Sequence, residues 1–185
     1  MAQTSPVLAV KRPLTVSKTS VEPVADSDKR WTSLIYSYAG AATFWLIWGT
    51  LVGLYLSYKF AAPDVDHISW LSYGRLRPVH TNTVFWGWSS LAMIAAALYV
   101  VPRTSMRRLW SYPLAWVAFW LINVSVLAGD VMLMAGINNA GQEYREYIWP
   151  VQLVFAVGVI LVAYNLARTI ADRGIEEIYI SNWYI

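Results

Sequence analysis

Cysteine is absent from this chain of 185 residues, and histidine occurs only twice. Without cysteine there is no disulfide, no thiolate metal ligand, no covalent c-type haem attachment and no cysteine nucleophile. Charge is also scarce, because Asp, Glu, Lys and Arg make up 14% of the residues, against roughly 25% in soluble domains. Hydrophobic residues make up 57%. The composition therefore argues against an ordinary soluble domain and favours a membrane protein.

The hydrophobic residues gather in four runs that are each long enough to cross a bilayer, which takes about 20 mostly apolar residues. The runs are residues 34–60, 79–101, 112–135 and 148–170. Tryptophan and tyrosine, many of them near the ends of these runs, fit the aromatic belts of a membrane–water interface. The sequence predicts an all-α, polytopic transmembrane helix bundle with four spans. The stretch 172–185, DRGIEEIYISNWYI, resembles the start of a fifth span.

Lysine and arginine are distributed unevenly around these spans. Ten of them lie on one side, before the first span, between the second and third spans, or at and after the end of the fourth span. Four lie on the other side, at the end of the first span or in the other two connections. The positive-inside rule therefore predicts that both termini are cytoplasmic. A pI near 9.2 raises the question of nucleic-acid binding, but the basic residues flank spans and form no patch or stripe. We expect no nucleic-acid partner.

Residues 1–30 differ in composition from the rest of the chain. They are polar, show no hydrophobic periodicity and lack the apolar core and cleavage site of a secretory signal. We predict that 1–30 is a disordered cytoplasmic tail. Residues 31–185 are predicted to form one transmembrane domain.

One stretch brings charge to the edge of a predicted span: RLRPVHTNTVFWGW, residues 75–88. An ionisable side chain within a membrane needs a partner or a function, and His80 is such a residue. On a regular helix Gly87 lies two turns from His80 on the same face, where a flat group could rest against the backbone. Arg75 and Arg77 can pair with carboxylates. The pattern fits a haem, with His80 as axial ligand, Gly87 packing against the macrocycle and both arginines at the propionates.

Other interpretations of these polar residues stay open. A lone histidine in a membrane can simply hydrogen-bond a neighbouring helix, and arginines at the end of a span commonly reach lipid headgroups. Thr81 or Asn82 could bond the free imidazole nitrogen or a propionate. His67 is interpreted as an ordinary surface histidine. Asp130, within the third span, needs a partner or a raised pKa.

Three stretches resemble a known family. GRLRPVHTN, residues 74–82, resembles the low-spin haem motif of subunit I of the haem-copper oxidase superfamily, and is most similar to the cbb3-type cytochrome c oxidases. GQEYREYIWP, residues 141–150, resembles the segment between the third and fourth helices of the family. EEIYISNWYI, residues 176–185, resembles a signature of the cbb3-type class. The resemblance covers residues 31–185 and implies the N-terminal portion of the subunit I fold.

The resemblance implies roles for individual residues. His80 matches one axial ligand of the low-spin haem b, and Arg77 and Arg75 match arginines on the propionate side. Glu143 resembles a glutamate near the propionates that helps to bind a structural calcium ion, and Glu146 is its companion in the motif. Carboxylate oxygen is the ligand that calcium prefers, although solvated surface charge is the simpler interpretation of both residues.

The resemblance also implies an activity: part of the catalytic subunit of a respiratory cbb3-type cytochrome c oxidase in a bacterial inner membrane. Cytochrome c and c-type cytochrome subunits would supply electrons, and O2 would be reduced to water with proton translocation. No histidine follows His80. The other axial ligand and the ligands of the high-spin haem and copper are therefore expected from later helices outside this chain, and no catalytic residue is expected within it.

Two further functions stay open at this point. The same motifs are compatible with a nitric oxide reductase of this superfamily, which would differ in the later helices. The absence of a second histidine in any span is also compatible with a non-catalytic membrane protein, either an assembly factor or a remnant of a longer gene.

Overall fold

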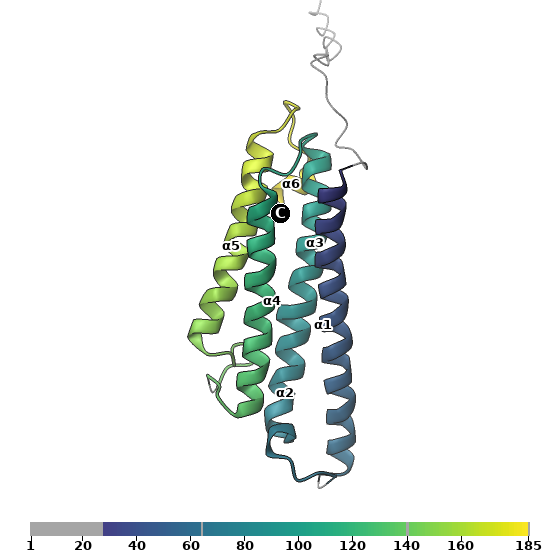
Figure 1. Ribbon diagram of the computed structural model, residues 1–185, viewed down its shortest axis with the longest axis vertical. Helices are drawn as coiled ribbons and strands as arrows, with labels where there is room; N and C mark the ends of the chain where they lie inside the picture. Colours follow the sequence, from purple (N-terminus) through teal and green to yellow (C-terminus); the bar gives the residue numbers. More distant parts are fainter. Residues whose placement is uncertain (1–27, 64, 140, 185) are drawn as a thin grey trace, which may run out of the picture.

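Four long helical rods lie side by side and alternate in direction (Figure 1). The computed structural model describes residues 28–63, 65–139 and 141–184, and these contain no strand. The first rod is α1 (Lys29–Ala61); the second joins α2 (Tyr73–Asn82), the π-helix η2 (Thr83–Ser89) and α3 (Ser90–Thr104); α4 (Tyr112–Ala135) and α5 (Trp149–Ala171) are the third and fourth. Two short helices, η1 (Ser69–Leu71) and α6 (Ile180–Trp183), lie in the connections.

All four rods are long and apolar enough to cross a membrane. The prediction of an all-helical protein with four candidate spans is therefore confirmed. The second rod begins at Tyr73, six residues before the predicted span, so His80 lies within a helix and not at its first turn. Of the predicted tail, 1–27 lies outside the described residues, and residues 29 and 30 are the first two residues of α1.

Local sequence signals explain where the helices begin and end. The Asp28 side chain accepts a hydrogen bond from the Arg30 backbone N–H and caps α1, and Ser111 caps α4 through the N–H of Leu114 in the same way. Proline occupies the first turns of α4 and α5, where the missing N–H costs nothing. Gly136 ends α4 with φ of 86°, a left-handed conformation that glycine adopts without strain.

Glycines allow the rods to approach one another closely. A Cβ atom on Gly158 of α5 would lie 2.8 Å from Cγ1 of Ile122 and 3.4 Å from the carbonyl oxygen of Ala118, both on α4. A Cβ on Gly129 of α4 would lie 2.4 Å from the ring of Tyr147. In a membrane the hydrophobic effect does not drive helices together, so close packing of this kind supplies much of the attraction.

The connection between α1 and α2 is held by one carboxylate. Asp66 accepts hydrogen bonds from the Tyr55 hydroxyl, from the Ile68 backbone N–H at 2.9 Å and from the Lys59 ammonium at 3.0 Å. These donors, led by Tyr55, lower the pKa of the Asp66 carboxyl to about 2. Lys59, although charged, is buried, and this ion pair satisfies it.

The segment after α5 turns back toward the end of α3. Thr104 of α3 donates a hydrogen bond of 2.7 Å from its hydroxyl to Oδ1 of Asn182, which lies in α6. The Gly174 N–H donates to the Ser105 carbonyl at 2.9 Å. The stretch that resembles the start of a fifth span is thereby attached to the second rod (Figure 1).

We predict that Gly158→Leu destabilises the protein by about 1–3 kcal/mol, because the added side chain overlaps Ile122 at a contact with no spare volume. The measurement is the thermal unfolding midpoint in detergent. Val157→Leu is the matched control. It should leave the midpoint unchanged, since Val157 is 41% exposed. Equal midpoints for both variants would contradict the prediction.

Candidate functional site

His80 is held by the backbone of the neighbouring rod. Its Nδ1 lies 2.7 Å from the carbonyl oxygen of Gly49 in α1. A carbonyl only accepts hydrogen bonds, so Nδ1 must carry the proton. In the neutral imidazole, Nε2 then keeps its lone pair, and this is the atom that a metal ion would use. The hydrogen bond therefore fixes both the tautomer and the orientation of the ring.

A second glycine of α1 makes room for this imidazole. A Cβ atom on Gly53 would lie 2.7 Å from Cε1 and 2.9 Å from Nδ1 of His80. Real Cβ atoms do not approach other atoms this closely, so any side chain at Gly53 would displace the ring. At Gly49, one turn earlier, an added Cβ atom would lie 2.8 Å from Cγ2 of Val84. The two glycines allow α2 and η2 to lie directly against α1.

A cavity of about 290 Å³ opens beside His80. Its walls are aromatic and exposed, with Phe85 at 45% and Trp88 at 38% exposure. The residues that line it are His80, Thr81, Val84, Phe85, Trp88, Ser89 and Tyr144. An imidazole with a free Nε2, a neighbouring apolar surface and exposed aromatic rings are features that suit a flat macrocycle with a central metal.

The two arginines before His80 have different partners. Arg77 pairs with Glu143 at 2.7 Å, and both side chains are about half exposed. Arg75 donates from Nη1 to the Met134 carbonyl at 3.0 Å and packs against Gly136 at the end of α4. Arg77 thus ties α2 to the connection before α5, while Arg75 ties α2 to α4.

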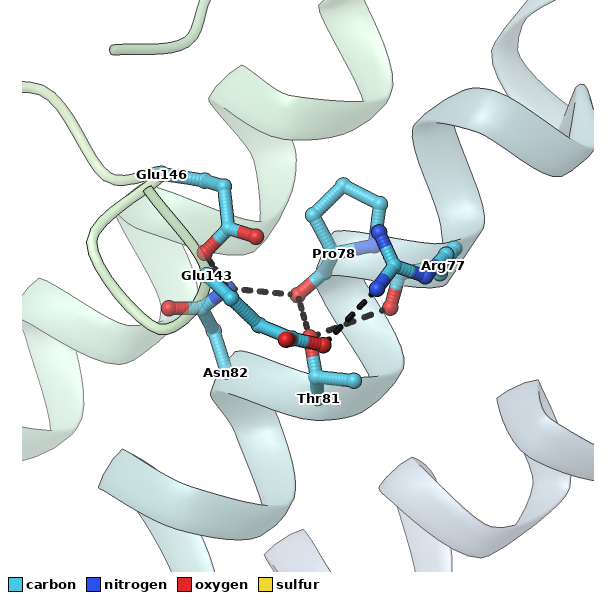
Figure 2. Close-up of polar contacts among 6 residues, drawn as sticks. All are labelled: Arg77, Pro78, Thr81, Asn82, Glu143 and Glu146. Atoms are coloured by element: carbon cyan, nitrogen blue, oxygen red, sulfur yellow. Dashed lines mark hydrogen bonds and ion pairs between the residues drawn. The ribbon is translucent and has the colours of Figure 1, made fainter. Parts of the chain in front are cut away.

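Asn82 links the same helix to the second glutamate of the connection. Its Nδ2 donates to the Pro78 carbonyl and to Oε2 of Glu146, both at 2.8 Å (Figure 2). Thr81 bonds the carbonyls of Arg77 and Pro78. Neither residue bonds the imidazole in this structure, because the Gly49 carbonyl is the partner of Nδ1. A bond from either residue to a propionate stays a prediction.

The predicted calcium site stays a prediction. Glu143 is paired with Arg77, and Glu146 accepts from Asn82 (Figure 2). Asn82 is buried and its Oδ1 has no hydrogen-bond partner in the described part of the chain, an oxygen that a hard cation could use. Within the described residues, however, no group of three or more His, Cys, Asp or Glu side chains could hold a metal ion.

Asp130 is the centre of a buried polar cluster that the sequence did not reveal. Its carboxyl accepts one hydrogen bond from the Thr83 hydroxyl and one from the Tyr147 hydroxyl, both at 2.7 Å. Thr83 opens η2, and Tyr147 stands in the connection one residue after Glu146. Asp130 therefore joins the rod that carries His80 to the connection that carries both glutamates.

Gly87 lies against α1 in the structure. Thr83–Ser89 forms a π-helix, whose i to i+5 hydrogen bonds widen the turn and shift later residues off the face expected for a regular α-helix. Gly87 is buried, and its Cβ would lie 2.9 Å from the Trp45 ring. It therefore serves the contact with α1, and its packing against a haem stays a prediction.

The comparisons with known proteins bear directly on this arrangement. A family model described as cytochrome c and quinol oxidase polypeptide I matches residues 33–185. The chain belongs to this family. It is 34% identical over 175 residues to cytochrome c oxidase subunit 1 of Rhodobacter capsulatus, which covers 91% of this chain and 32% of the relative.

Further relatives of this oxidase family are about as similar to the chain and are likewise covered only in part. The cbb3-type cytochrome c oxidase subunit CcoN1 of Stutzerimonas stutzeri is 31% identical over 160 residues, which is 83% of this chain and 34% of the relative. A cytochrome c oxidase subunit 1 homolog of Agrobacterium tumefaciens (strain T37) is 33% identical over 144 residues, 78% of this chain and 26% of the relative. The chain thus spans about a third or less of the length of these relatives.

We predict that Gly53→Ala displaces the His80 ring and breaks its hydrogen bond to Gly49, because the new Cβ overlaps the imidazole. The ¹⁵N NMR spectrum of the two histidines should change from the Nδ1–H tautomer to a mixture for His80, with His67 as an internal reference. Gly40→Ala is the matched control, since nothing lies within 4 Å of a Cβ there. An unaltered His80 signal in Gly53→Ala would refute this assignment.

We also predict that Thr83→Val and Tyr147→Phe each destabilise the protein by about 1–3 kcal/mol, because each leaves the buried Asp130 carboxyl without one donor. Since both variants act on one group, their effects should not add in the double variant. Denaturant unfolding in mixed micelles measures this. Thr50→Val and Tyr58→Phe are controls, because both side chains are exposed. If the controls lose as much stability as Thr83→Val and Tyr147→Phe, the hydrogen bonds to Asp130 do not contribute to stability.

Proposed function

We propose that this protein is part of the catalytic subunit of a cbb3-type cytochrome c oxidase and holds its low-spin haem b through His80. The whole enzyme would transfer electrons from cytochrome c, through c-type cytochrome subunits, to O2, which is reduced to water with proton translocation. It would lie in a bacterial inner membrane with both termini cytoplasmic. The relatives named as oxidase subunits, including one cbb3-type subunit, support this proposal.

The observation that carries the proposal is the hydrogen bond from Nδ1 of His80 to the Gly49 carbonyl. It leaves Nε2 as the free ligand atom and holds the ring against two glycines of α1. A histidine that served only to join two helices would need no cavity beside it. His80 instead lines a cavity with exposed aromatic walls.

Each residue of the site has a defined task in this proposal. His80 would hold the iron of the haem, which supplies a one-electron carrier when bound. Phe85 and Trp88 would cover its apolar faces and exclude water. Arg77, which is 53% exposed and pairs with Glu143, can exchange that carboxylate for a propionate. Arg75 is held at α4 by the Met134 carbonyl and adds positive charge at the same end.

Oxygen reduction itself needs ligands that this sequence does not contain. No histidine follows His80 and there is no cysteine. The other axial ligand, the high-spin haem and copper would therefore be held by other polypeptide segments. The share of each relative that this chain spans, about a third or less, is consistent with that division.

The test compares the only two histidines of the chain. His80→Ala should abolish the low-spin haem contribution to the Soret band and to the electron paramagnetic resonance spectrum. His67→Ala should retain both, since His67 is exposed in the connection after α1. The protein is purified from its membrane with any subunits that accompany it. If His80→Ala keeps the full low-spin signal, His80 is not the ligand and the proposal fails.

A further inference from the structure

At the opposite end of the bundle from the α1–α2 connection, the first turns of α1 and α4 enclose a notch of about 450 Å³. Two basic side chains, Lys29 and Arg30, line one side of it, together with Ser33 one turn further along α1. Tyr112, Pro113 and Trp116 of α4 line the other side. The notch thus combines a basic rim with an aromatic and apolar floor.

The notch carries positive charge from two basic side chains. Neither Lys29 nor Arg30 forms an ion pair with any residue that the structure describes. The carboxylate of Asp28 caps α1 and accepts a hydrogen bond of 2.8 Å from the hydroxyl of Tyr112, a residue of the notch. It places one negative charge beside the two cations. Arg108 acts electrostatically on Asp28 as a further positive charge. The N-termini of two long helices add to the positive potential.

The position of the notch along the helices sets what can reach it. It lies where α1 and α4 begin, at the level of the headgroups if the apolar parts of these helices occupy the hydrocarbon core. Trp116 and Tyr112 are rings of the kind that settle at this depth. Along α4 the same side continues into the hydrocarbon with Val117 at 50% and Trp120 at 61% exposure.

We propose that this notch binds one phospholipid, with its phosphate between Lys29 and Arg30 and an acyl chain along Trp116 and Trp120. Charge complementarity identifies the headgroup, because two cations at headgroup depth, with no ion-pair partner among the residues that the structure describes, attract an anionic phosphate. The apolar side of α4 distinguishes a lipid from a free phosphate ion, which would gain nothing from Trp116. This site is independent of the haem proposal, since it involves no residue of the His80 region.

A photoactivatable phospholipid tests the site on the unaltered protein. The lipid, phosphatidylglycerol with a diazirine in its acyl chain, is exchanged into the protein purified from its membrane with any accompanying subunits. After irradiation, mass spectrometry should find the label on the peptide that contains Trp116 and Trp120. Labelling spread evenly over the exposed faces of α1 and α5, with no excess at α4, would overturn the proposal.

Two kinds of variant separate a site from general attraction to a membrane. Lys29→Gln with Arg30→Gln should weaken retention of phosphatidylglycerol about fivefold for each cation removed. Ser33→Phe fills the notch without changing charge and should also release the lipid. The controls are Arg107→Gln with Arg145→Gln, which removes two charges outside the notch, and Thr43→Phe, which adds a ring at an exposed position of α1.

The readout is the amount of phosphatidylglycerol that remains per protein after detergent washing. The controls should retain as much as the unaltered protein. If the controls lose as much lipid as the notch variants, or if Ser33→Phe loses none, the notch is not a lipid site. A charge variant that fails to fold leaves Ser33→Phe and the cross-linking result to decide.

Discussion

The hydrogen bond between His80 and the Gly49 carbonyl determines how the site can be built. It requires an imidazole to reach the backbone of the neighbouring helix. This is feasible only if the residues of that helix at the point of contact are glycines. Gly49 and Gly53, one turn apart, meet this requirement. The same two positions bring η2 against α1, so the orientation of the ligand and the packing of two rods have one cause.

The end of the bundle around α2 is held together by polar groups that the membrane makes costly to leave unpaired. Asp130 binds Thr83 and Tyr147, Asn82 binds Glu146, and the pair of Arg77 and Glu143 lies at the exposed edge. The contacts of Thr83, Asn82 and Arg77 join the rod that carries His80 to α4 or to the connection before α5, and the contact of Tyr147 with Asp130 joins that connection to α4. The connection is therefore part of the site and not merely a link between two spans.

The sequence predicted the larger features well, because each has a local physical signature. Four apolar runs of sufficient length predicted four helices, and His80 was identified because an ionisable residue in a span is unusual. The roles of Gly49 and Gly53 could not be found this way, because a glycine in a membrane helix has no pattern that reveals which side chain approaches it. Asp130 was noticed, but its partners come from two other elements at separations of 47 and 17 residues.

The contact of Gly87 with α1 has a more general cause, which is the π-helix between α2 and α3. A regular helix advances near 100° per residue, so the side of the rod on which a residue lies depends on the number of residues before it. In η2 the wider turn absorbs part of that rotation. The number of residues in η2 therefore acts as an angular setting between two halves of one rod. With this number, His80 faces α1 on the α2 side of the π-helix, and Leu91 and Leu98 of α3 face the core on the other side. Inserting or deleting one residue in η2 would rotate α3 relative to α2, so that both sets of side chains could no longer face their present partners.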